Sequence, residues 1–217
     1  MLTSLFDMQG TYVVSAGLAL ILVLVLSLSL HEFGHAFAAY KQGDLTPKVN
    51  GRVTLNPLVH IDPIGFICCC LFGFGWAKPV EVNPLNFRKY KKGMVITSIA
   101  GVVVNLILAV IGCGLYFVCL RFLPITSGLN AFVAYFFYYL YILNIGLFIF
   151  NLLPIYPLDG FNCVAALTKY DNAFVNFMRK YGNIILILIL IFGDILLIKL
   201  LTWVAWPIET LWGFIIF

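Results

Sequence analysis

Residues 12–40 read YVVSAGLALILVLVLSLSLHEFGHAFAAY, a long apolar run with few polar side chains. Residues 12–30 carry no charged side chain, and the apolar pattern continues to Tyr40. A helix needs about 20 mostly apolar residues to cross the hydrocarbon layer of a bilayer. The stretch therefore predicts a membrane-spanning helix that carries a His-Glu-x-x-His pattern toward its C-terminal end.

The composition of the whole chain also indicates a membrane protein. Of the 217 residues, 63% are hydrophobic and 10% are charged, whereas soluble domains are about 45–50% apolar and about 25% charged. These proportions exclude an ordinary soluble globule, a disordered chain and a coiled coil. The six cysteines do not indicate a disulfide framework, because Cys68–Cys70 are consecutive and the other three lie in apolar runs.

Further apolar runs predict the other segments of the fold. Long runs at 94–120, 129–158 and 184–201 are expected to span the membrane. The shorter run Ile64–Ala77 favours a segment that enters the membrane and returns, and Trp203–Phe217, with three tryptophans, suits an interfacial C-terminal helix.

The segment Lys48–Asp62 differs from these runs. Its apolar residues alternate with polar ones, and Pro57 and the following Pro63 discourage a helix. The predicted fold class is therefore an all-α membrane protein, a polytopic helical bundle of about six segments, with a small membrane-associated β hairpin or strand after the first long helix.

Basic residues predict the orientation, because they accumulate in cytoplasmic loops. Only Arg121 lies in the loop after the second span. The two loops expected on the opposite side contain the other basic residues that flank the first four spans: Lys41, Lys48, Arg52, Lys78, Arg88, Lys89, Lys91, Lys92, Lys169, Arg179 and Lys180. We therefore expect a multi-pass protein of the cell membrane whose N-terminus is outside and whose active site lies toward the cytoplasm.

Ionisable side chains inside a membrane are costly, so each one marks a candidate functional site. His31 and His35 share one face of a helix, so both imidazoles can bind one metal ion. Glu32 lies next to them, where it can take a proton from a water activated by the metal. The pattern predicts a metal site, and the alternative is a set of polar residues that pair within a bundle.

Asp159 is the candidate for the third ligand that a catalytic zinc site usually has. It lies in the stretch NLLPIYPLDG, residues 151–160, where Pro154 and Pro157 prevent a helix and Gly160 permits a tight turn. The first and third spans both run inward, so Asp159 should lie on the same side as the two histidines. The alternative is that Asp159 is the N-cap of the helix that follows.

Three other polar residues have different expected roles. Asp194 is expected to pair with Lys199 or with a polar residue of another helix, and His60 is interpreted as a structural or surface histidine. Asn105 follows Gly101 by four residues. It either bonds across to a helix that approaches the glycine or donates to a peptide carbonyl in an active site.

The ordered motifs resemble those of the site-2 proteases, which are intramembrane zinc metalloproteases with a six-helix architecture. The resemblance is closest to their compact prokaryotic branch, without a PDZ insertion or a cystathionine-synthase-type (CBS) domain. It rests on HEFGH (31–35), GRVTLNP (51–57), HIDPIG (60–65), GWAKPV (75–80), Gly101-x-x-x-Asn105 and the 151–160 stretch.

The resemblance implies one Zn²⁺ per chain, bound by His31, His35 and Asp159, with Glu32 as the general base. It further implies that Asn105 and Asn151 hold the substrate strand or stabilise the oxyanion. The expected partners are a transmembrane protein substrate and the lipid bilayer, with no nucleic acid.

The expected activity is that of an endopeptidase that cleaves within or near the transmembrane segment of its substrate, as in regulated intramembrane proteolysis. Residues 1–217 should form one integral-membrane metalloprotease domain, with a catalytic core at about 12–170 and C-terminal helices at about 182–217. The strand expected in 48–62 could pair with an unwound substrate. The alternatives are a catalytically silent family member and a metal-binding membrane protein or transporter.

Overall fold

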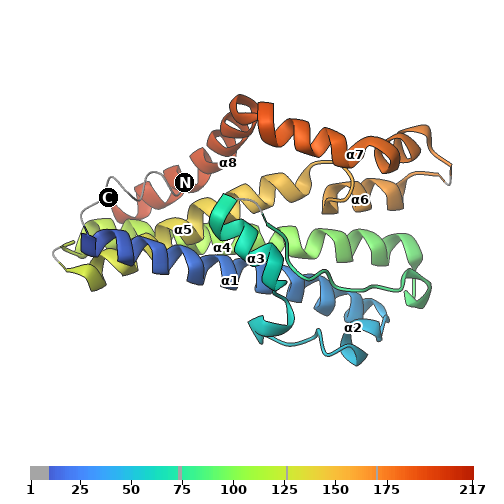
Figure 1. The fold of residues 1–217 in the computed structure, drawn as a ribbon, viewed down its shortest axis with the longest axis horizontal. Coiled ribbons are helices and arrows are strands. Elements are labelled where there is room, and N and C mark those ends of the chain that lie inside the picture. Colours follow the sequence, from blue (N-terminus) through green and yellow to red (C-terminus); the bar gives the residue numbers. More distant parts are fainter. Residues whose placement is uncertain (1–9, 73–74, 126, 170) are drawn as a thin grey trace.

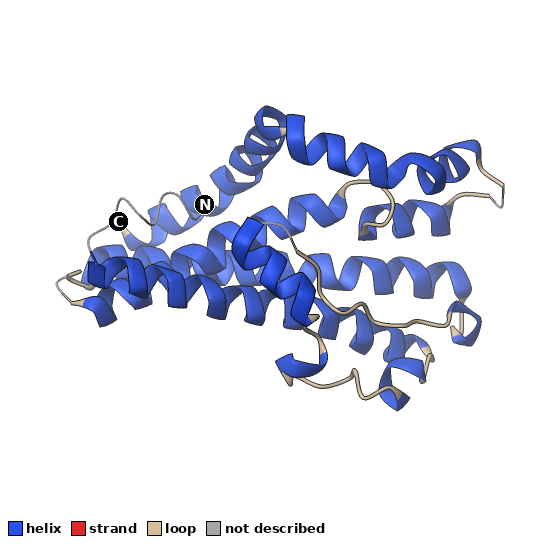
Figure 2. Ribbon diagram, in the orientation of Figure 1, coloured by secondary structure: helices blue, strands red, loops and turns tan. Residues whose placement is uncertain are grey.

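Helices make up most of the chain (Figure 2). The structure, a computed structural model, describes residues 10–72, 75–125, 127–169 and 171–217. Within these residues, five helices are long and apolar enough to cross a membrane: α1 (Gly10–Gln42), α4 (Tyr90–Phe122), α5 (Gly128–Leu152), α7 (Ala173–Phe192) and α8 (Asp194–Ile216). The shorter elements are α2 (Thr46–Val49), η2 (Pro57–Val59), α3 (Pro63–Phe72), η3 (Pro84–Asn86) and α6 (Asp159–Leu167). The chain is therefore an all-helical, multi-pass membrane protein.

Helices α1, α4 and α5 pack against one another and form the core of the bundle (Figure 1). Small residues let their backbones approach, as membrane helices commonly do. A Cβ on Gly34 of α1 would lie 3.2 Å from the carbonyl oxygen of Ala100 in α4. Between α5 and α1, Asn144 Nδ2 donates to Ser27 Oγ at 2.8 Å. The three helices thus make a close-packed frame for the polar residues inside it.

Helices α7 and α8 lie outside this core, and α8 is attached by two polar contacts. The hydroxyl of Tyr141 donates to Glu209 Oε1 at 2.8 Å, and Nε1 of Trp212 donates to the carbonyl oxygen of Val110 at 2.9 Å. Much of the remaining surface of both helices is exposed and apolar, as expected of helices that face lipid.

The prediction of one span at 184–201 is wrong, because the helix breaks at Gly193. The N–H of Gly193 closes α7 by bonding to the carbonyl oxygen of Ile189 at 2.8 Å, and Asp194 opens α8. A carboxylate in the first turn is favourable at the positive end of a helix. The segment Trp203–Phe217, expected as a separate interfacial helix, belongs mostly to α8, which ends at Ile216.

The predicted β hairpin or strand at 48–62 is also wrong. This segment contains part of α2, turns and η2, and its only pairing of the β type is an isolated bridge between Ile61 and Ala77. Two side chains of this segment bond to backbone carbonyl oxygens within it. Arg52 Nη1 donates to the carbonyl oxygen of Val59, and His60 Nε2 lies 2.9 Å from that of Thr54.

The bridge also brings the two ends of the 61–77 excursion together. The N–H of Lys78 donates to the carbonyl oxygen of His60 at 2.8 Å. At the start of α3, a Cβ on Gly65 would lie 2.9 Å from Cδ1 of Trp76. The chain therefore leaves and returns at one place, as a re-entrant segment requires.

The basic loops share one end of the bundle. Figure 1 shows the C-terminal end of α1, the N-terminal end of α4 and the loop between α6 and α7 on the same side of the picture. This arrangement agrees with the distribution of basic residues in the sequence. The assignment of this end to the cytoplasm stays a prediction.

Asp44 joins the end of α1 to two later segments through a buried carboxylate. It accepts hydrogen bonds from the N–H and hydroxyl of Thr46 at 3.0 and 2.7 Å, from the N–H of Asn83 at 2.7 Å and from Nδ2 of Asn86 at 2.9 Å. Burial by itself would raise the pKa of Asp44, but these bonds outweigh burial and hold that pKa below its usual range. The ionised form of Asp44 therefore fixes the loops at this end of the bundle.

We predict that Asp44→Asn lowers the free energy of unfolding in mild detergent by about 1–3 kcal/mol, because the donors of Thr46, Asn83 and Asn86 lose a charged acceptor. The folded-state pKa lies below the unfolded-state value, so this stabilisation is present above about pH 4 and is lost as the pH falls through the folded-state pKa. Thermal unfolding of both proteins as a function of pH measures it. Glu81→Gln, which changes an exposed carboxylate, is the control, and equal melting of wild type and Asp44→Asn at pH 7 would contradict the assignment.

Candidate metal centre

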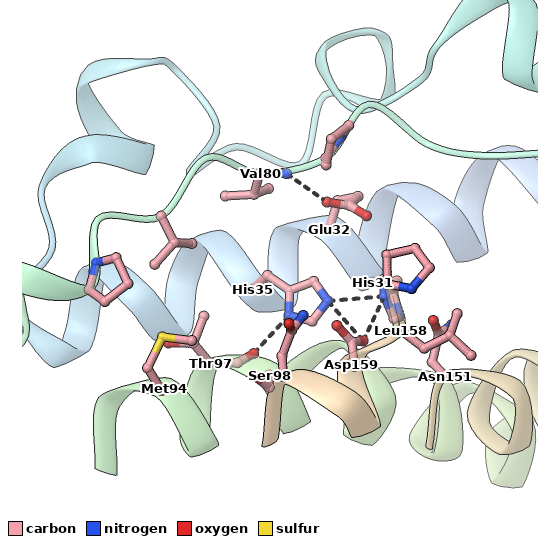
Figure 3. Close-up of a pocket in the computed structure, with 15 residues that line it drawn as sticks. His31, Glu32, His35, Val80, Met94, Thr97, Ser98, Asn151, Leu158 and Asp159 are labelled. Atoms are coloured by element: carbon pink, nitrogen blue, oxygen red, sulfur yellow. Dashed lines mark hydrogen bonds and ion pairs between the residues drawn. The ribbon is translucent and has the colours of Figure 1, made fainter. Parts of the chain in front are cut away.

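Two histidines of α1 and one aspartate of α6 meet inside the bundle (Figure 3). His31 and His35 lie one turn apart, and their Nε2 atoms are 3.0 Å from each other. Oδ2 of Asp159 lies 3.3 Å from Nε2 of His31 and 3.2 Å from Nε2 of His35. The structure thus brings together the three residues that the sequence predicted as metal ligands.

A proline-rich turn delivers Asp159 to this point. Helix α5 ends at Leu152, and the chain then turns through bonds from the N–H of Ile155 to the carbonyl oxygen of Leu153 and from the N–H of Leu158 to that of Ile155, both 2.8 Å. Helix α6 begins at Asp159, whose side chain makes no capping bond because Leu158 is the N-cap. The N-cap alternative for Asp159 is therefore wrong, and its carboxylate points to the histidines instead.

Helix α4 forms the wall against which both imidazoles rest. Nδ1 of His35 lies 2.7 Å from the carbonyl oxygen of Thr97, and Nδ1 of His31 lies 3.0 Å from the Asn105 amide. Gly101 lies between them on the same face of α4, and a Cβ there would be 2.5 Å from Nε2 of His35. Thr97, Gly101 and Asn105 follow one another at intervals of four residues, so they share this face of α4. Thr97 and Asn105 each contact one imidazole, and Gly101 leaves the space that the rings occupy.

The hydrogen bonds determine which ring nitrogens are free. The carbonyl oxygen of Thr97 only accepts, so Nδ1 of His35 carries a proton, and the neutral imidazole then has its lone pair on Nε2. The Oδ1 of Asn105 is buried without a partner, and turning this amide over would let Oδ1 accept from Nδ1–H of His31. In that arrangement both Nε2 lone pairs point toward Asp159.

Three acceptor atoms at this spacing require a cation or a proton among them. Zinc bonds of about 2.0 Å in a tetrahedral site place ligand atoms about 3.3 Å apart, and the three atoms here are 3.0–3.3 Å apart. The donor set and its spacing therefore fit a zinc ion.

The three atoms open onto a cleft of about 390 Å³. Glu32 lines this cleft, and its Oε2 accepts a hydrogen bond from the N–H of Val80 at 3.1 Å (Figure 3). Asn151 lines it as well, and its Nδ2 donates to the carbonyl oxygen of Leu147 within α5 at 3.1 Å. The Glu32 carboxylate, which is not part of the three-residue cluster, is thus held at the same cleft.

Sequence reasoning missed Thr97 and Val80. Both act through backbone groups, which every residue carries, so no side-chain pattern could have indicated them. His60 lies outside the cluster. It is fully buried, and its Nε2 is 2.9 Å from the carbonyl oxygen of Thr54 in the loop before α3.

A helical membrane bundle that gathers two histidines, an aspartate and a nearby glutamate has the features of a membrane metallopeptidase. The chain belongs to Peptidase family M50, the site-2 proteases. The profile of that family matches residues 122–193, and the chain is 44% identical over 149 residues to YwhC of Bacillus subtilis (strain 168), with 68% of each chain covered.

Other relatives are Rip2 proteins of two mycobacteria. Identity is 32% over 147 residues to Rip2 of Mycolicibacterium smegmatis (strain ATCC 700084 / mc(2)155), covering 64% of this chain and 53% of that protein. The chain is 36% identical over 143 residues to Rip2 of Mycobacterium tuberculosis (strain ATCC 25618 / H37Rv), and the match covers 63% of this chain and 52% of that protein. The names of YwhC and Rip2 class them provisionally as zinc metalloproteases. No solved structure shows a significant match to the chain.

We predict that Gly101→Ala abolishes metal binding, because the new methyl group would occupy the space of the His35 and His31 rings. The zinc content of the purified protein should fall to a small fraction of the wild-type value. Gly146→Ala on α5 is the matched control, since nothing lies within 4 Å of a Cβ there. Full zinc content in Gly101→Ala would show that the imidazoles do not rest on this face of α4.

Proposed function

We propose that this chain is an intramembrane zinc endopeptidase that hydrolyses a peptide bond within or near the transmembrane segment of a membrane-protein substrate. The observation that carries the proposal is the meeting of His31, His35 and Asp159 at 3.0–3.3 Å inside a bundle of membrane-spanning helices. Membership of Peptidase family M50 makes the chain a metalloprotease, and the names of its relatives support zinc as the metal.

The residues of the cleft supply the acid–base chemistry. Zinc, when bound by His31, His35 and Asp159, supplies a Lewis acid for the scissile carbonyl and for the attacking water. Glu32 takes the proton of that water and passes it to the leaving amine. The N–H of Val80 holds the Glu32 carboxylate at the cleft, so the base is already oriented before the substrate enters.

Asn105 and Thr97 act as positioning residues for the two histidines. Partners of this kind fix the orientation and tautomer of a metal-binding imidazole. The contact of Asn105 with His31 supports this role, whereas a contact of Asn105 with the substrate or the oxyanion stays a prediction. Asn151 lines the cleft, and we assign it to binding of the substrate backbone.

The substrate has to unwind before it can react. In lipid, a helix satisfies all of its backbone groups internally, so its peptide bonds are shielded. The cleft of about 390 Å³ holds a short extended stretch and not a helix with its side chains. We therefore infer that a locally unwound transmembrane segment enters from the bilayer.

The chain as a whole fits this function as one membrane domain. We propose residues 1–217 as a single metalloprotease unit, with its catalytic core at about 12–170 and its C-terminal helices at about 182–217. The N-terminus would lie outside the cell and the metal centre toward the cytoplasmic side.

We predict that Glu32→Gln retains zinc and loses cleavage of a single-span substrate by about 10²–10⁴-fold, because the cleft loses its general base. Zinc content and cleavage of a labelled substrate, both in detergent, measure the two effects. Glu81→Gln is the control for loss of a glutamate outside the cleft. Cleavage at the wild-type rate by Glu32→Gln would refute the assigned base, and a wild type that binds zinc but cleaves no substrate would favour a silent family member.

We predict that Asn105→Leu weakens zinc binding by about 10–100-fold, the usual effect of losing the partner of a ligand. Asn105→Asp should restore most of the affinity, because a carboxylate also accepts from Nδ1–H of His31. Competition with a zinc chelator measures the affinity, and kcat is measured at saturating zinc. Wild-type zinc affinity with a large loss of kcat in Asn105→Leu would instead assign Asn105 to the substrate or the oxyanion.

A further inference from the structure

A second polar cavity, of about 500 Å³, lies where α4, α6 and α7 meet, at the end of α6 away from Asp159. Tyr90 and Lys91 of α4 line it, together with Lys169, Asp171 and Arg179 from the α6–α7 loop and α7. None of the residues that line the metal-site cleft also lines this cavity. We propose that it is a binding site for a phosphate-bearing anion.

The charges of the cavity are unbalanced. Three cations, Lys91, Lys169 and Arg179, face one carboxylate, Asp171, so the lining has a net charge of +2. Oδ1 of Asp171 already accepts a hydrogen bond from Nδ2 of Asn176 at 2.6 Å. Within the described parts of the chain, the only ion pairs are those of Asp159 with the two histidines. The three cations are therefore available for an anion from outside the protein.

The start of α4 adds to this excess of positive charge. Its N-cap, Lys89, makes no side-chain capping bond, and no acidic residue lies in its first turn. Arg88, Lys89, Lys91 and Lys92 instead lie next to or within this first turn, at the positive end of the helix dipole, where cations are unfavourable and anions are stabilised. The first turn of α7 also reaches the cavity through Val175. A bound anion would relieve this repulsion.

Phosphate is the anion that these groups suit. An Arg guanidinium binds phosphate oxygens in pairs, and Lys adds point charges. The cavity lies at the end of the membrane-spanning helices α4 and α7, where lipid headgroups are found, and basic pockets between membrane helices bind anionic headgroups. A phospholipid headgroup and free phosphate share this chemistry, and the experiment distinguishes these two sources.

The test compares wild type with the triple variant Lys91→Gln/Lys169→Gln/Arg179→Gln. The matched control is Lys41→Gln/Lys48→Gln/Lys180→Gln, which removes the same charge from three lysines outside the cavity, each near an aromatic ring. The full chain in a neutral detergent is titrated with short-chain phosphatidylglycerol, short-chain phosphatidylcholine and inorganic phosphate. The melting temperature and native mass spectra report binding, and circular dichroism reports the fold.

We expect phosphatidylglycerol to raise the melting temperature of wild type saturably, and phosphatidylcholine to have a much smaller effect. The dissociation constant should rise at least about tenfold in the cavity variant and change little in the control. If inorganic phosphate gives the same saturable shift, the result supports the site and identifies free phosphate as its ligand. If the triple variant does not fold, Arg179→Gln alone replaces it, and we expect a smaller rise in the dissociation constant.

Two results would overturn the proposal. One is the absence of a saturable response of wild type to both phosphate sources. The other is an equal loss in the cavity variant and the charge-matched control, since this would reduce the effect to general attraction between a basic protein and an anionic surface.

Discussion

Three candidate metal-binding atoms lie close together within a bundle of membrane-spanning helices, where water solvates them poorly. Nε2 of His31, Nε2 of His35 and Oδ2 of Asp159 lie 3.0–3.3 Å apart inside the bundle. Such a group is unfavourable without a cation among its members. The features around it follow from this constraint: Gly101 leaves room for the rings, α4 holds their other nitrogens, and the turn after α5 brings in the carboxylate.

The helices of the bundle differ in whether they contribute to the metal cluster. Helices α1 and α4 hold the two histidine ligands and their partners, and with α5 they are packed closely through small residues and buried amides. Helices α7 and α8 carry no member of the metal cluster and expose apolar side chains. Helix α6 joins two polar regions, because it begins at the ligand Asp159 and its last turn, with Ala165 and Ala166, lines the basic cavity.

The meeting of His31, His35 and Asp159 could be predicted because charged residues are rare in the sequence. His31, His35 and Asp159 stood out against long uncharged runs, and the basic loops placed them on one side. Backbone partners such as the carbonyl of Thr97 leave no trace in a sequence. The strand at 48–62 was predicted from alternation and from the prolines that discourage a helix, but Arg52 and His60 bond to carbonyl oxygens within this segment. The span at 184–201 was predicted from hydropathy, which gives Gly193 no weight as a helix breaker.

X-ray absorption spectroscopy at the zinc edge identifies the atoms that bind the metal. For the purified wild-type protein, we expect one zinc per chain with two imidazole nitrogens and one or more oxygens, at bond lengths of about 2.0–2.2 Å. Sulfur at about 2.3 Å would instead assign the metal to cysteines. That result, or a spectrum with no imidazole scattering, would contradict the assignment of His31, His35 and Asp159 as the zinc ligands.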